Sequence, residues 1–124
     1  MIGVARHFRI VAELQHAFPD LPMIGSGYSW LQKYLVNAGA ANIMAGDTTF
    51  LGYGRAALPY PELARDVLER GDLDERRVCK TLTFCTYLMR SRNHPMGQFP
   101  TGCPPFDKEA YGSIMKEAKA SRRA

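Results

Sequence analysis

The chain has 124 residues, of which 46% are hydrophobic, and 16 Lys and Arg against 12 Asp and Glu give it a formal net charge of +4. This composition excludes disordered, collagenous and fibrous proteins. No apolar stretch reaches the roughly 18 residues that a membrane span needs, and Arg6, His7 and Arg9 lie where a secretory signal would be apolar. We therefore expect a cytoplasmic protein with no membrane partner.

Positive charge is concentrated in the second part of the sequence. Residues 1–75 hold six basic and nine acidic side chains, whereas residues 76–124 hold ten basic and three acidic ones. A basic segment can attract nucleic acid, but here the charges are spread along the whole segment with few aromatic side chains beside them. We expect a solvated surface there and rank nucleic acid last among the partners.

The first part of the chain alternates predicted helices with predicted strands. Apolar residues at three- and four-residue spacing predict an amphipathic helix over Arg6–Phe18, which Pro19 stops. Its two histidines, His7 and His16, fall on the polar side of that helix, where a surface role is expected. The apolar run Leu21–Ile24 then predicts a buried parallel strand that ends in a glycine-rich loop.

A second strand and helix repeat this order. Ser29 is the predicted N-cap of a helix that begins at Trp30 and breaks at Gly39 before it resumes. Gly46–Asp47 is a helix stop. The β-branched and aromatic residues of Thr48–Tyr53 predict the second strand, which also runs into a glycine loop.

A third helix and a basic tail complete the predicted order. The third helix covers Pro61–Gly71, and the tail is irregular apart from one short helix over Lys108–Lys119. The chain therefore divides into a segment with two β/α units, residues 1–75, and a cysteine-containing C-terminal extension, residues 76–124. The predicted fold class is α/β. Because two strands make a poor sheet, we expect a second copy or an upstream chain to complete it.

Each predicted strand ends in a glycine-rich turn, Gly25–Gly27 after the first and Gly52–Arg55 after the second. Glycine lets backbone amides approach a phosphate, and Arg55 can add a forked pair of donors, so the two turns together suggest a site for one anion. The turns lack the third glycine of a dinucleotide fingerprint, the Lys of a P-loop and the flanks of a nucleophile elbow. The alternative is that the glycines only serve tight turns.

Several runs together carry a family resemblance. Leu21–Leu31, Phe50–Pro61, Cys79, Cys85–Arg90 and Gly102–Cys103 resemble, in this order, the old yellow enzyme family of NADH:flavin oxidoreductases. The resemblance covers most of the chain. It implies the last two β/α units of that family's FMN-binding TIM barrel, plus the C-terminal segment, without the upstream part of the barrel.

The resemblance also implies a cofactor and a set of binding residues. Ser26 and Gly27 match the family's first phosphate loop, and Gly54 and Arg55 match the second, so these four residues would bind the phosphate of FMN. The family's catalytic residues come from earlier strands, so none is assigned here. The expected function is the C-terminal part of an FMN-dependent NAD(P)H oxidoreductase, similar to an ene-reductase. The alternative is a non-catalytic module, derived from that family, that assembles with itself or with a partner.

Three cysteines, Cys79, Cys85 and Cys103, lie in the C-terminal part. An odd count without an export signal argues against a disulfide framework. Some members of the family carry an iron–sulfur cluster in this region, but Leu82 stands where the resemblance places another cysteine, and a four-iron cluster takes four thiolates. With His94 the cysteines could form a Cys₃His zinc site, but no two of them have zinc-like spacing. We expect reduced, partly buried thiols and no metal.

Overall fold

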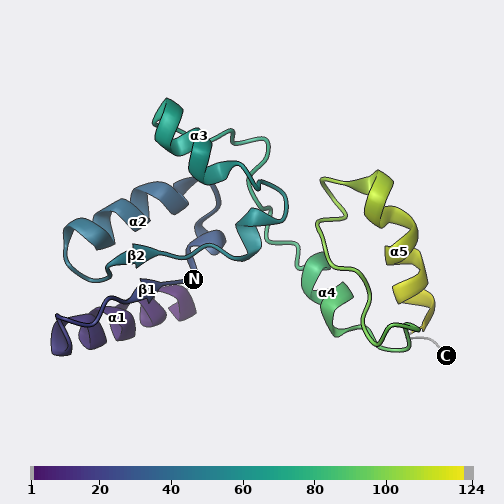
Figure 1. Ribbon diagram of the computed structural model, residues 1–124, viewed down its shortest axis with the longest axis horizontal. Helices are drawn as coiled ribbons and strands as arrows, with labels where there is room; N and C mark the ends of the chain where they lie inside the picture. The colour runs from purple at the N-terminus through teal and green to yellow at the C-terminus, as the bar shows by residue number, and fades with distance from the viewer. Residues whose placement is uncertain (1, 122–124) are drawn as a thin grey trace.

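The computed structural model of the protein describes residues 2–121. Its elements in chain order are α1 (Ile2–Ala17), β1 (Ile24–Gly25), the 3₁₀ segment η1 (Tyr28–Tyr34), α2 (Leu35–Met44), β2 (Phe50–Leu51), η2 (Arg55–Ala57), α3 (Leu63–Arg70), α4 (Phe84–Arg90) and α5 (Lys108–Ser121). Two lobes are visible in Figure 1: α1, α2, α3 and both strands form the first, and α4 and α5 form the second. The protein is mainly helical with one small parallel sheet, which makes it α/β in the broad sense.

The sheet is shorter than the sequence predicts. The strands β1 and β2 run parallel with Ile24 opposite Phe50, and each strand has only two residues. The predicted strand over Leu21–Ile24 overlaps β1 only at Ile24, and the predicted strand over Thr48–Tyr53 contains β2 but is too long. The first strand was also expected to be buried, whereas Leu21 is 55% and Ile24 66% exposed because no further element of the described chain covers that face of the sheet. A third strand beside the pair would be needed to fix longer strands, and residues 2–121 supply none.

The helix between the two strands differs from its prediction at both its start and its break. Gly27, with a φ of 92°, precedes the 3₁₀ segment η1, so Ser29 is not an N-cap. The chain kinks at Gln32, where φ is 52°, instead of at Gly39. Gly39 lies inside α2, where an added Cβ would come within 2.5 Å of the Leu51 side chain. Glycine there lets α2 approach β2 closely.

The C-terminal part is more regular than the predicted irregular tail. The helix α5 confirms the prediction over Lys108–Lys119 and extends it slightly. The helix α4, Phe84–Arg90, was missed: it is seven residues long, and Thr83 before it, with a φ of 62°, gives no side-chain cap. A helix this short carries too few turns for its periodicity to stand out in the sequence. The irregular segments are therefore the loops that flank α4.

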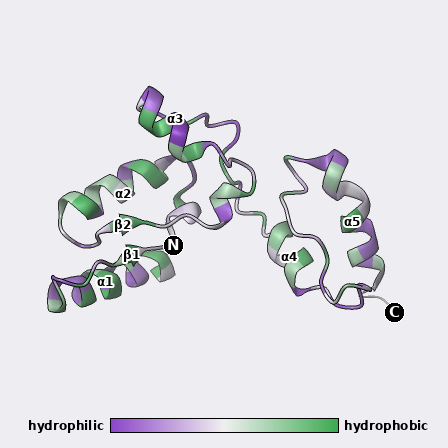
Figure 2. Ribbon diagram, viewed as in Figure 1, coloured by the Kyte–Doolittle hydropathy of each residue, from purple (hydrophilic) through white to green (hydrophobic). Residues whose placement is uncertain are grey.

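Each lobe has its own hydrophobic core. The first core cluster consists of Tyr28, Leu35, Ala56, Tyr60, Leu63, Leu73, Val78 and Cys79. The second core cluster consists of Leu88, Phe99, Met115 and Ala118. Figure 2 shows that hydrophilic and hydrophobic residues share the helices of both lobes, as amphipathic helices on small cores require. Val78 and Cys79 pack into the first core cluster, although the predicted boundary assigns them to the C-terminal extension. The division into residues 1–75 and 76–124 stays a prediction.

None of the helices in residues 2–121 has the length and apolarity that crossing a bilayer demands.

Candidate anion-binding site

The two glycine-rich turns lie side by side at one end of the sheet. Since β1 and β2 are parallel, their carboxyl ends meet at the same edge. The amide of Gly52 donates a hydrogen bond to the carbonyl of Gly25 at 2.7 Å. Four residues later in each segment, the amide of Ala56 donates a hydrogen bond to the hydroxyl of Ser29 at 3.2 Å. The structure therefore brings together the segments that hold Ser26, Gly27, Gly54 and Arg55.

Thr48, which is only 3% exposed, holds the two strands in this register. Its hydroxyl oxygen accepts a hydrogen bond from the amide of Gly25 at 2.7 Å. The same hydroxyl can donate a hydrogen bond to the carbonyl oxygen of Met23 or of Phe50, each 3.1 Å from the hydroxyl oxygen. Sequence reasoning assigned Thr48 only to a strand, because nothing in the local pattern shows that its side chain reaches across to a residue 23 positions earlier.

The glycines of the two turns serve different purposes. Gly27 has a φ of 92°, in the left-handed region that favours glycine. At Gly52 an added Cβ would lie 3.0 Å from the carbonyl oxygen of Gly25, so the close approach of the strands requires glycine there. An added Cβ at Gly54 would meet no atom within 4 Å. Backbone conformation therefore explains Gly27 and packing explains Gly52, whereas neither requires glycine at Gly54.

Arg55 carries a positive charge that the described part of the chain does not neutralise. It begins η2, and its guanidinium carbon lies 4.6 Å from the centre of the Trp30 ring, a cation–π contact between the second turn and the segment after the first. Its Nη1 atom is buried and has no hydrogen-bond partner in residues 2–121. Because a buried guanidinium nitrogen is costly without an acceptor, this atom is able to bind an acceptor that the described residues do not supply.

The turn after β1 borders an open pocket of about 470 Å³. The pocket is lined by Gly3, Val4, His7, Ser26, Gly27 and Trp30. The Nε2 atom of His7 and the hydroxyl of Ser26 share a hydrogen bond of 2.9 Å. The expected surface role fits His16, which lies exposed 3.3 Å from Asp47. It also fits His7, which is only partly buried in the wall of this open pocket, where α1 turns it toward a loop that lies 19 residues later.

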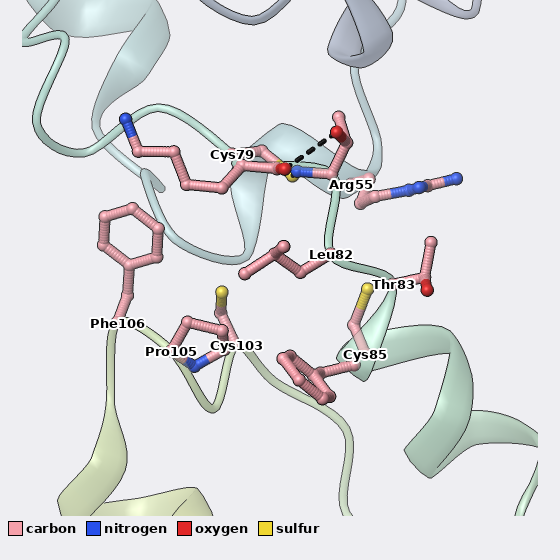
Figure 3. A pocket seen from close by; sticks show the side chains of 11 residues that line it. Arg55, Cys79, Leu82, Thr83, Cys85, Cys103, Pro105 and Phe106 are labelled. Carbon is pink, nitrogen blue, oxygen red and sulfur yellow. Dashed lines mark hydrogen bonds between the residues drawn. The ribbon is translucent and has the colours of Figure 1, made fainter.

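A second pocket brings the three cysteines together at the junction between the lobes (Figure 3). Cys79 and Cys85 are buried and Cys103 is partly buried, and all three are free thiols. Burial, together with the nearby thiols of Cys79 and Cys85, raises the pKa of Cys103 above its ordinary value. Arg55 borders the same pocket, and Figure 3 shows its guanidinium pointing away from the thiols.

The pocket beside the three cysteines is small, and His94 is not among the residues that line it. Its free volume is about 20 Å³, which is about the room that one water needs. The ring of His94 packs against Phe99, with 4.8 Å between the ring centres, so His94 is not placed beside the three cysteines. In residues 2–121 no group of three or more His, Cys, Asp or Glu residues is placed to hold a metal ion.

Comparisons with protein families, with curated proteins and with solved structures found no match.

Proposed function

We propose that the chain is the C-terminal part of an FMN-dependent NAD(P)H oxidoreductase of the old yellow enzyme type, and that it supplies the flavin phosphate site. In this proposal β1, α2, β2 and α3 correspond to the last two β/α units of a TIM-like barrel, which the chain alone leaves incomplete. The observation that carries the proposal is the buried Nη1 of Arg55, which has no hydrogen-bond partner among residues 2–121 and belongs to one of two adjacent glycine-rich turns.

The proposed site recognises a dianionic phosphate group. Ser26 and Gly27 would contribute backbone amides from the first turn, Gly54 would contribute an amide from the second, and Arg55 would contribute its guanidinium. Trp30 holds that guanidinium in place through the ring contact. When FMN is bound, it supplies hydride transfer, whereas these residues only bind and orient its phosphate. No catalytic residue is assigned to this chain.

The proposal predicts that the protein distinguishes FMN from riboflavin, which has the same ring without the phosphate. Titrations followed by quenching of flavin fluorescence should give a dissociation constant for FMN at least about tenfold lower than for riboflavin. Arg55→Gln should remove that preference, because a charge-assisted hydrogen bond contributes about 1.5–3 kcal/mol.

Arg90→Gln is the matched control, because it removes the same charge from an exposed position on α4 in the other lobe. It should leave both dissociation constants unchanged. Equal affinity for FMN and riboflavin, or an equal loss in the Arg55 and Arg90 variants, would contradict a phosphate site at Arg55.

The exposed face of the sheet favours the second candidate function, a module that assembles with itself or with an upstream barrel chain. Ile24 is 66% exposed and Phe50 is 56% exposed, and they lie opposite each other in the register. No third strand among the described residues covers the outer edges of the pair. Apolar side chains on an open parallel sheet are normally covered by further protein.

Self-assembly through this face predicts oligomers in sedimentation equilibrium at micromolar concentrations of the chain alone. Phe50→Glu should dissociate them, since a carboxylate would have to be buried in the new interface. The control Leu68→Glu adds the same charge at a residue of α3 that is 85% exposed, and it should leave the mass unchanged. A wild-type monomer at every concentration would rule out self-assembly.

A further inference from the structure

His7 faces the first glycine turn from α1 and is the one titratable side chain among the residues that line the pocket there. Besides the 2.9 Å hydrogen bond between its Nε2 and Ser26, its Cδ2 would lie 3.5 Å from a Cβ added to Gly27. The imidazole is therefore packed against the backbone of the turn whose amides belong to the proposed phosphate site. A ligand that reaches Ser26 and Gly27 meets His7 as well.

The partners of His7 leave room for an anion. Its Nε2 pairs with the neutral hydroxyl of Ser26, and no carboxylate among residues 2–121 pairs with it. The guanidinium of Arg55 contacts the ring of Trp30, which lines the same pocket as His7. Because a histidine that activates a serine nucleophile is normally oriented by an acid, the described residues argue against that role for Ser26.

The geometry points to His7 and Ser26 as ligand-binding residues that extend the anion site, with a phosphate monoester as the ligand class. This inference rests on the proposed function, and it adds side-chain donors from α1 and from the first turn to the amides and the guanidinium already named. The serine hydroxyl donates a hydrogen bond to one phosphate oxygen, and a ring N–H of His7 donates to another.

Sulfate is the sharpest probe, because it carries two negative charges, as a phosphate monoester dianion does, and has no flavin ring. Sulfate titrations of the whole chain, followed by NMR chemical shifts, should give saturable binding. His7→Gln should weaken sulfate binding about tenfold. Ser26→Ala should weaken it less.

His16→Gln is the matched control, because His16 lies on the same helix outside the pocket. It should behave like the wild type. If His7→Gln binds sulfate as tightly as the wild type while Arg55→Gln has lost FMN binding, this inference fails and the proposed function stands. If neither sulfate nor FMN binds the wild type, both fail.

Discussion

Replacement of Tyr28 by alanine should lower the free energy of unfolding by about 3–5 kcal/mol, the usual cost of truncating a buried aromatic side chain. Tyr28 is 1% exposed, and its ring stacks on Phe8 with 4.6 Å between the ring centres. Its hydroxyl accepts a hydrogen bond of 3.0 Å from the side-chain amide of Asn42. The substitution would thus leave a cavity between α1, η1 and α2.

Tyr34→Ala is the control for this prediction, because Tyr34 lies in the same 3₁₀ segment and is 62% exposed. Its effect should stay within about 0.5 kcal/mol. Tyr28→Phe keeps the ring, loses only the hydroxyl and should cost about 0.5–1.5 kcal/mol. Urea unfolding followed by circular dichroism measures all three, and equal midpoints for Tyr28→Ala and Tyr34→Ala would contradict the packing described for η1.

Tyr28→Ala should also weaken FMN binding under conditions in which the variant is still folded. Gly27 directly precedes Tyr28, and the buried ring anchors the end of the turn that holds Ser26 and Gly27. A turn without that anchor samples more conformations, so its amides are less well placed for a phosphate.

Leu88→Ala should lower the free energy of unfolding by about 2–5 kcal/mol. Leu88 is fully buried in the second core cluster, where Phe99 and Met115 surround it. That cluster has only four buried members, so a cavity there removes a large share of the packing that holds α4 against α5. Met89→Ala, at the next residue of α4, is the control, because Met89 is 53% exposed.

Unlike Tyr28→Ala, Leu88→Ala should leave the affinity for FMN unchanged in the folded variant. The proposed phosphate site lies in the first lobe, and Leu88 packs only into the second core cluster. Urea unfolding and flavin titration of the same sample test both statements. A Leu88 variant that is as stable as the Met89 variant, or one that is folded but has lost FMN binding, would contradict this account.

Local sequence patterns were sufficient for most of α1, for α3 and α5, and for the two turns. The apolar spacing in Arg6–Phe18 predicted α1 except for its first residues, Ile2 to Ala5, because a helix repeats its buried face every three to four residues. Gly71 predicted the end of α3, because glycine readily adopts the left-handed conformation that ends a helix. The glycine-rich ends of the two strands likewise predicted turns in the right places. These features depend on residues that are close in the sequence.

Features that depend on distant residues could not be predicted in this way. The chain kinks at Gln32 and not at Gly39, which lies inside α2 and packs against Leu51, twelve residues later. The side chain of Thr48 reaches back to Gly25, and His7 meets Ser26 across 19 residues. The local pattern at each of these positions is compatible with several partners.

The sequence by itself determined an α/β order of elements, two glycine turns and an arginine suited to bind an anion. Only the tertiary structure decided that the turns share one edge of the sheet, that a nitrogen of Arg55 is buried without a partner in the described part of the chain, and that His7 belongs to the pocket wall. The physical reason is that chain-local patterns set backbone conformation, whereas burial and hydrogen bonding between distant residues arise only when helices and strands pack together.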